Sequence, residues 1–161
     1  MKKYIKKYYL VWITAICLVA VDLLTKFIFD GKIITIIPNV FSIYSTYNTG
    51  SAFGAFSNQT LWLICLSIIF LAVIITFDKF HKEEDKLYLF SYSLIIAGAV
   101  GNLIDRVFFG YVRDFIRIDF FDFTNINTVF NVADICVTVG VVLMLIYFLK
   151  SIIKEKKKKN D

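Results

Sequence analysis

The sequence predicts an α-helical integral membrane protein with four transmembrane helices and a small extracytoplasmic β-sheet and loop region. Three observations support this fold class. Of the 161 residues, 58% are hydrophobic and 19% are charged, and the hydrophobic residues are concentrated in four long runs. The mean hydropathy is +0.71. A soluble domain of this length cannot bury so much apolar surface, so we expect lipid to solvate part of it.

The predicted spans are 10–29, 61–77, 87–107 and 133–149. Each run has the length of about 17–25 residues that a helix needs to cross the hydrocarbon core of a bilayer. A spanning segment must satisfy its own backbone hydrogen bonds, and a helix does so. No linker or internal repeat interrupts the pattern, so we treat residues 1–161 as a single membrane-embedded domain. The basic start and the first apolar run lack a small-residue cleavage site, which indicates a retained anchor.

The distribution of basic residues predicts the orientation of the chain. Lysines gather at both ends and in the loop 78–86, whereas the other two loops together contain only three basic residues. The first set is Lys2, Lys3, Lys6, Lys7, Lys79, Lys82, Lys86, Lys150, Lys154 and Lys156 through Lys159, and the second is Lys32, Arg113 and Arg117. The positive-inside rule therefore places both termini in the cytoplasm. The net charge of +5 suits anionic lipid headgroups, and we expect no nucleic-acid partner.

The two outer loops have the composition of short strands. Residues 32–37 and 40–44 are rich in branched and aromatic residues and flank the turn-forming pair Pro38–Asn39. Residues 112–119 have a similar composition. These segments predict a small sheet on the outer membrane surface, with one apolar face against lipid or helices.

Polar side chains lie toward the outer ends of three predicted spans. Asp22 and Lys26 are four residues apart on one face of the first span, where the simplest interpretation is an ion pair. The other members of this group are Asn102, Asp105, Arg106, Asn131, Asp134 and, in the adjoining loop, Asp114. Charges scattered toward lipid would be very unfavourable, so we expect these side chains to share a partly wet cleft.

The residue types limit the chemistry that such a cleft can perform. His81, the only histidine, lies in the predicted cytoplasmic loop, so a Ser-His-Asp or Cys-His site at the outer face is excluded. The three cysteines lie in apolar runs without metal-ligand spacing, so we expect neither disulfides nor zinc. Two chemistries remain: Mg²⁺ held by carboxylates, or two carboxylates that share a proton. The outer-face candidates are Asp105, Asp114, Asp119, Asp122 and Asp134, and composition does not choose among them.

Five motifs occur in the order typical of one family. They are Asp22-Leu-Leu-Thr-Lys26, Asn48-Thr-Gly-Ser-Ala-Phe53, Gly98-Ala-Val-Gly-Asn-Leu-Ile-Asp-Arg106, Val112-Arg-Asp-Phe-Ile116 and Phe130-Asn-Val-Ala-Asp134. With the four apolar runs in matching places, the chain resembles the bacterial lipoprotein signal peptidases (signal peptidase II). The resemblance covers essentially the whole sequence between the lysine-rich ends.

This resemblance implies an aspartic endopeptidase of the bacterial plasma membrane with its active site at the extracytoplasmic face. Its substrates would be diacylglyceryl-modified prolipoproteins, cut just before the lipidated cysteine. The catalytic pair would be Asp114 and Asp134. The implied supporting and substrate-binding residues are Asp22, Lys26, Asn48, Gly50, Asn102, Asp105, Arg106 and Asn131. The resemblance also implies contact with membrane lipids, inhibition by globomycin-type peptides and no cofactor or metal, and we expect a monomer.

Two residues depart from the family pattern. Ala99 stands where a second glycine is common, and Arg113 precedes Asp114 where an apolar residue is frequent. If Arg113 points toward the two aspartates, it would lower the pKa of one of them.

Two other functions remain as alternatives from different classes. A Mg²⁺-dependent lipid-headgroup transferase would lose activity in a chelator. A membrane scaffold or small transporter would place polar residues at mid-membrane and on both sides, rather than at the outer end alone.

Overall fold

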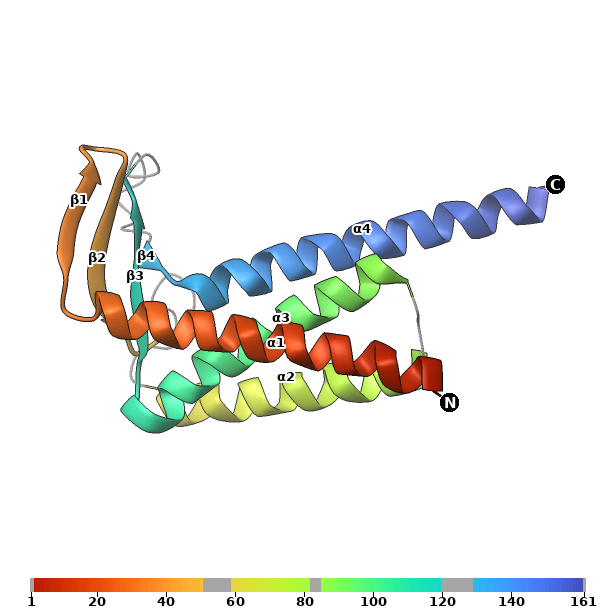
Figure 1. Cartoon of the computed structure of the whole chain (residues 1–161), viewed down its shortest axis with the longest axis horizontal. Helices are drawn as coiled ribbons and strands as arrows, with labels where there is room; N and C mark the ends of the chain where they lie inside the picture. The colour runs from red at the N-terminus through yellow and green to blue at the C-terminus, as the bar shows by residue number, and fades with distance from the viewer. Residues whose placement is uncertain (1, 51–58, 82–84, 120–128, 161) are drawn as a thin grey trace.

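The computed structural model describes residues 2–50, 59–81, 85–119 and 129–160 (Figure 1). Its elements are α1 (Lys2–Phe29), β1 (Ile33–Ile37), β2 (Phe41–Asn48), α2 (Thr60–His81), α3 (Lys86–Phe109), β3 (Val112–Ile118), β4 (Val129–Phe130) and α4 (Val132–Asn160). All four helices are long and apolar enough to cross a membrane, and the strands form one small antiparallel sheet. The predicted fold class is therefore confirmed, and each predicted span lies within one of the helices.

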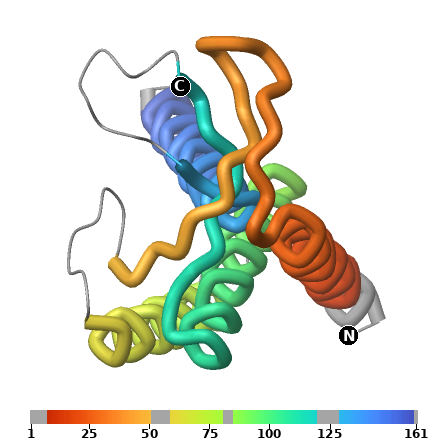
Figure 2. The backbone as a smooth tube through the Cα atoms, turned by 90° about the vertical axis from the view of Figure 1, so that its left-hand side faces the viewer, coloured from red at the N-terminus to blue at the C-terminus, as the bar shows by residue number. Residues whose placement is uncertain are grey.

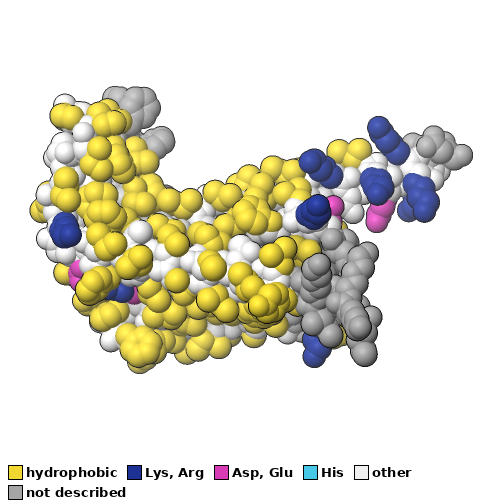
Figure 3. All heavy atoms as spheres, viewed as in Figure 1, with side chains coloured by type: hydrophobic (Ala, Val, Ile, Leu, Met, Phe, Trp, Pro, Cys, Tyr) yellow, Lys and Arg dark blue, Asp and Glu magenta, His cyan; other side chains and the backbone are white. Residues whose placement is uncertain are grey.

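Helix α3 is the central element of the bundle. It packs against α1, α2 and α4, which lie around it when the molecule is viewed from the end that carries the sheet (Figure 2). In its most apolar stretch 56% of the residues are buried, compared with 6% in α2 and 17% in α4. Large exposed apolar side chains cover the outside of the bundle (Figure 3). This surface is suited to contact with lipid acyl chains, whereas α3 is shielded by protein.

Glycines allow α3 and α4 to approach closely. A Cβ atom on Gly98 would lie 2.3 Å from the carbonyl oxygen of Ala133, and one on Gly140 would lie 3.0 Å from the backbone nitrogen of Ile95. Small residues at such a contact are typical of helix packing in membranes, where backbones rather than long side chains meet. The close contact places the first turn of α4 beside the C-terminal half of α3.

The two ends of α3 have clear capping signals. Asp85 precedes the helix, and its side chain accepts hydrogen bonds from the backbone nitrogens of Leu87 and Tyr88. Gly110 ends the helix in the left-handed conformation, with φ +81°, and its nitrogen donates to the carbonyl of Arg106. A glycine adopts this conformation without steric cost. The turn leads within two residues into β3, so the start of β3 lies next to the C-terminal end of α3.

The sheet has the strand order β1-β2-β3-β4 and runs across the helix axes at one end of the bundle (Figure 1). The predicted strands agree with β1, with the first part of β2 and with β3, but β2 continues to Asn48, and β4 was not predicted. On its inner side Phe115 is buried and stacks on Phe29 of α1, with ring centroids 5.1 Å apart. All five residues of the edge strand β1 are exposed. The sheet therefore contacts the helices through β3, in agreement with part of the predicted arrangement.

Candidate functional site

Asp114 and Asp134, called here the acidic pair, lie on either side of Asn131. Asp114 is in the middle of β3, Asp134 is in the first turn of α4, and Asn131 immediately precedes that helix. The Asn131 Nδ2 atom donates to Asp114 Oδ1 at 2.6 Å, and its backbone nitrogen donates to Asp134 Oδ2 at 3.1 Å. In return, the backbone nitrogen of Asp134 donates to Asn131 Oδ1 at 3.0 Å. This reciprocal cap of α4 holds the Asp134 carboxylate, and the side chain of the same asparagine holds the Asp114 carboxylate.

A second amide binds each carboxylate from another element. Asn48, at the end of β2, donates from Nδ2 to Asp114 Oδ2 at 3.0 Å. Asn102, on α3, donates from Nδ2 to Asp134 Oδ1 at 2.8 Å. All four carboxylate oxygens of the acidic pair therefore accept a hydrogen bond. Because the donors come from three separate segments, both carboxylates have a fixed orientation.

Lys26 sets the orientation of the Asn102 amide. Its Nζ atom donates to Asn102 Oδ1 at 2.9 Å, which turns Nδ2 of that amide toward Asp134. The same Nζ lies 2.8 Å from Asp22 Oδ2, so the ion pair predicted from the four-residue spacing is present. Both side chains are completely buried. Lys26 therefore links the buried ion pair of α1 to the acidic pair.

Asp22 also contacts the start of α4. Its Oδ1 atom accepts a hydrogen bond from the backbone nitrogen of Ala133 at 2.8 Å, where the free backbone N–H groups of the helix favour a negative charge. Gly101 makes room for this carboxylate, since a Cβ atom there would lie 2.5 Å from Asp22 Oδ2. The sequence analysis did not assign a role to Gly101. The sequence feature that could have indicated a role for Gly101 is its position within the third motif, Gly98–Arg106.

Arg106 holds the end of β2 beside the site. Its Nη2 atom donates to the carbonyl oxygen of Gly50 at 3.1 Å, and the nitrogen of Gly50 donates to Asn48 Oδ1 at 2.9 Å. The Asn48 amide is thereby oriented with Nδ2 toward Asp114. Asn48, Gly50 and Arg106 were all among the predicted supporting residues, and the structure brings them together.

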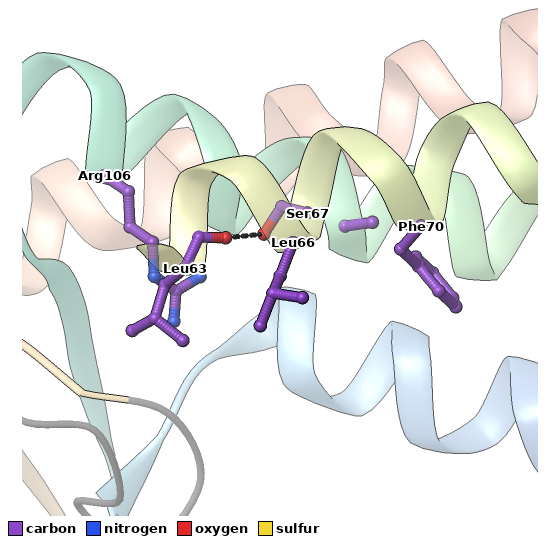
Figure 4. Close-up of a pocket in the computed structure, with 6 residues that line it drawn as sticks. Leu63, Leu66, Ser67, Phe70 and Arg106 are labelled. Atoms are coloured by element: carbon purple, nitrogen blue, oxygen red, sulfur yellow. Dashed lines mark hydrogen bonds between the residues drawn. The ribbon is translucent and has the colours of Figure 1, made fainter. Parts of the chain in front are cut away.

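Arg106 also borders an open, mainly apolar groove between α2 and α3. The groove has a volume of about 260 Å³ and is lined by Leu63, Leu66, Ser67, Phe70, Ala99 and Arg106. Figure 4 shows the α2 side chains Leu63, Leu66 and Phe70 on the side toward which Arg106 extends. Ala99 faces this groove, whereas the glycines on either side of it, Gly98 and Gly101, face α4. The departure at position 99 therefore lies away from the close contact between α3 and α4.

Arg113 points to Asp105 and not to the acidic pair. Its backbone nitrogen and Nε donate to Asp105 Oδ2 at 2.9 and 3.3 Å, and its Nη2 donates to Asp105 Oδ1 at 2.7 Å. The guanidinium also lies 4.4 Å from the ring centroid of Phe109, an additional favourable contact. The predicted supporting residue Asp105 is completely buried, and Lys26 Nζ lies 3.5 Å from its Oδ2.

The pKa of Asp114 is raised to about 7. Burial is the largest cause, because it disfavours the charged form, and the negative charge of Asp134 is the second. The hydrogen bonds from Asn48 and Asn131 and the charge of Lys26 act in the opposite direction. A carboxyl group with this pKa can hold or release a proton near neutral pH, which general acid–base chemistry requires.

The other carboxylates considered from the sequence lie elsewhere. Asp119, just after β3, forms an ion pair with Arg117. Asp122 lies outside the described residues, as do Ser51, Ala52 and Phe53 of the second motif. In the described part of the chain, no group of three or more His, Cys, Asp or Glu side chains could hold a metal ion. Asp114 and Asp134 therefore accept hydrogen bonds from asparagines, Asp22 pairs with Lys26, and Asp105 pairs with Arg113.

The fold and the site together define a multi-pass membrane protein with a pair of carboxylates, one buried and one half-buried, at one end of its helical bundle. The model of the signal peptidase (SPase) II family matches residues 14–150. The chain belongs to this family, which consists of peptidases that process lipoproteins.

Individual relatives agree with the family match. The lipoprotein signal peptidase of Clostridium acetobutylicum is 39% identical over 145 residues, which are 87% of this chain and 92% of the relative. That of Microcystis aeruginosa is 39% identical over 142 residues, 84% of this chain and 88% of the relative. A bacterial membrane enzyme solved by the in meso method at 2.3 Å resolution is similar in structure, with a TM-score of 0.79, 33% identity and coverage of 87% of each chain.

Proposed function

We propose that this protein is a membrane aspartic endopeptidase that cleaves the signal peptide from diacylglyceryl-modified prolipoproteins, just before the lipidated cysteine. The observation that carries the proposal is the placement of Asp114 and Asp134 on the two sides of Asn131, each held by two donors. Two carboxylates in such a position share one proton, because two adjacent negative charges repel each other.

The two carboxylates have different roles in the proposed hydrolysis. Asp134, at the N-terminal end of α4, is the ionised member and accepts a proton from the attacking water. Asp114, which has its pKa raised to about 7, is the protonated member and donates to the carbonyl oxygen of the scissile bond. When the tetrahedral intermediate collapses, the proton held by Asp134 passes to the leaving nitrogen, and the proton that Asp114 gave to the oxygen returns to Asp114. Water is thus added across the peptide bond without an acyl-enzyme or a cofactor.

The apolar groove between α2 and α3 supports the proposal that the substrate carries a lipid. Its lining by Leu63, Leu66 and Phe70 suits an apolar segment or acyl chain, and Arg106 places a positive charge at its border. The acyl chains of the substrate would remain in the bilayer while its scissile bond reaches the acidic pair. Globomycin-type peptides would compete for this site, and we propose that the protein acts as a monomer.

The proposed location is the bacterial plasma membrane, with both termini in the cytoplasm and the acidic pair at the extracytoplasmic face. Among the described residues, the lysines of the C-terminal part of α4 lie at the opposite end of the molecule from the sheet (Figures 1 and 3). The positive-inside rule then favours an extracytoplasmic position for the sheet and the acidic pair.

The decisive experiment incubates the purified protein with a prolipoprotein that carries the diacylglyceryl group and with the same protein without lipid. We expect cleavage of the lipidated form alone, and we expect it to persist in a chelator. Asp114→Asn and Asp134→Asn should each lower the rate about a thousandfold or more, because either change removes one half of the proton-sharing pair.

Asp119→Asn is the matched control, because Asp119 pairs with Arg117 and has no contact with the acidic pair among the described residues. It should keep most of the activity. Full activity of either substitution in the acidic pair, or equal cleavage of the unlipidated protein, would contradict the proposal. Loss of activity in the chelator would instead favour metal-dependent chemistry.

A further inference from the structure

The contact between Arg113 and Asp105 has no direct role in the proposed hydrolysis, yet it is one of the most extensive polar contacts of the molecule. Arg113 donates three hydrogen bonds to one carboxylate, and the two side chains are 10% and 0% exposed. A carboxylate buried to this extent needs a close positive partner, since its desolvation costs several kcal/mol. Arg113 is the closest such partner of Asp105.

Lys26 is the second cation near Asp105, but it is also required elsewhere. Its Nζ atom lies 3.5 Å from Asp105 Oδ2, compared with 2.8 Å from Asp22 Oδ2 and 2.9 Å from Asn102 Oδ1. Without Arg113, Lys26 would be the cation of the described residues left in ion-pair distance of Asp105, with Arg106 acting on it from farther away. The attraction would draw its Nζ toward that carboxylate and away from Asn102. The hydrogen bond from Asn102 to Asp134 would then lose its orientation.

Removal of Arg113 changes the charge around the acidic pair. The charged groups on the elements packed around the pair are Asp22 and Lys26 from α1, Asp105 and Arg106 from α3, and Arg113 from β3, whereas the amides of Asn48, Asn102 and Asn131 are neutral. Arg113 points to Asp105, and the charge of Asp30 also acts on its guanidinium. Without Arg113 the charge of Asp105 is less compensated, and an uncompensated negative charge favours protonation of the acidic pair.

We propose that Arg113 is a positioning residue that acts through Asp105: it neutralises this buried carboxylate, leaves Lys26 on Asn102, and so keeps the Asn102 amide directed at Asp134. The inference rests on the proposed function of the acidic pair. It also assigns a role to a residue at which this chain departs from the usual pattern of its family, where an apolar side chain is frequent.

The first variant is Arg113→Val, which removes the cation and leaves Asp105 charged. Both limbs of the pH profile of kcat/KM should move upward by about one pH unit, because an uncompensated negative charge favours protonation of the acidic pair. Because Asn102 loses its orientation toward Asp134, we expect kcat at the optimum of the variant's profile to be about tenfold below that at the wild-type optimum, and KM to change less than twofold. The second variant, Arg113→Lys, keeps the charge and should keep the wild-type profile.

The double variant Arg113→Val with Asp105→Asn is the sharpest comparison. The asparagine oxygen can still accept the hydrogen bond from the backbone nitrogen of residue 113, while the charge is removed together with its partner. We expect the pH profile to return to that of the wild type and the activity to exceed that of Arg113→Val at least threefold. An unshifted profile in Arg113→Val, or a double variant with the same shift as the single one, would overturn the proposal.

Two controls separate this inference from other failures. Cleavage by the wild type, together with inactivity of Asp114→Asn, establishes the proposed function independently of Arg113. Thermal unfolding in detergent identifies variants that fail to fold. If Arg113→Val is not folded, Arg113→Gln replaces it, and equal pH profiles for Arg113→Gln and Arg113→Lys would then exclude the role of the charge.

Discussion

The amide of Asn131 has every hydrogen-bonding atom occupied. Its Oδ1 caps the first turn of α4, while its Nδ2 donates to Asp114 and, at 3.2 Å, to Asn102 Oδ1. A neutral amide can bind a carboxylate whether or not the carboxylate is ionised, and it adds no charge that would abolish the proposed proton sharing. At the scale of single residues, the site thus combines charged groups that set the electrostatics with amides that set the geometry.

Substitution of Asn131 can separate its two roles. Asn131→Ser keeps a side-chain oxygen that can cap α4 but removes the Nδ2 donor to Asp114. We expect its thermal stability to remain close to that of the wild type, with activity reduced more than tenfold. Asn131→Ala should lose the cap as well, at a cost of about 1 kcal/mol. Unfolding measurements and cleavage assays on both variants test this, and an active Asn131→Ser would show that the bridge is dispensable.

The pKa of Asp114 leads to a prediction for the alkaline limb of the pH profile. Because this pKa is about 7 in the folded protein, kcat/KM should decline as the pH rises through this value and the pair loses its shared proton. The hydrogen bond from Asn48 favours the ionised form and so lowers the pKa of Asp114. Asn48→Ala should therefore shift the decline to higher pH. Thr46→Val, opposite Asp114 on β2, is the control and should leave it in place.

At the scale of elements, α3 is the axis on which the site is assembled. One face of its C-terminal half carries Gly98 and Gly101, which admit α4 and the Asp22 carboxylate. Asn102 and Asp105 follow on the same helix and bind α4 and β3. Close packing and polar contacts therefore come from successive residues of one buried helix, so a small displacement of α3 would disturb the whole site.

Substitutions on the two faces of α3 should differ in effect. Gly101→Ala would bring a methyl group within 2.5 Å of Asp22 Oδ2, so we expect activity to fall at least a hundredfold. Gly98→Ala would meet the backbone of α4 and should destabilise the protein by about 1–3 kcal/mol. Ala99→Gly, on the groove side, should retain activity. Cleavage rates and thermal unfolding of the three variants test this prediction. A larger loss of activity or stability in Ala99→Gly than in the two glycine variants would contradict it.

At the scale of the whole molecule, the chain is polarised along the helix axes. The 29 residues of α4 extend about 43 Å, longer than the hydrocarbon core of about 30 Å, and the excess length carries the C-terminal lysines. The sheet and the acidic pair lie at the other end of this helix (Figure 1). This arrangement suits an enzyme that meets its substrate at one membrane surface only.

Labelling of cysteine variants tests the orientation. Lys32, next to β1, and Lys157, near the end of α4, are both exposed. In intact cells a membrane-impermeant thiol reagent should modify Lys32→Cys but not Lys157→Cys, and permeabilised cells should allow both. The wild type, with its own three cysteines, provides the background. The reverse labelling pattern would place the acidic pair in the cytoplasm and contradict the proposed orientation.

Much of the fold could be predicted from the sequence because its signals are local. An apolar run, a lysine-rich loop or the turn at Pro38–Asn39 is recognisable without knowledge of distant residues. The strand β4 was missed because two residues, Val129 and Phe130, carry no periodic pattern. The continuation of β2 to Asn48 was missed because its pairing with β3, and not its own composition, defines it.

Local patterns in the sequence were enough to predict an integral membrane protein with four spans. They also predicted that polar side chains lie toward one end of three of these spans. It left five outer-face carboxylates open, and the family resemblance, rather than residue chemistry, selected Asp114 and Asp134. Only the tertiary structure decided which groups touch: it placed Asn131 between the two aspartates and turned Arg113 toward Asp105. The physical reason is that hydrophobicity is additive along a chain, whereas hydrogen bonds and ion pairs depend on atoms that packing brings together from distant segments.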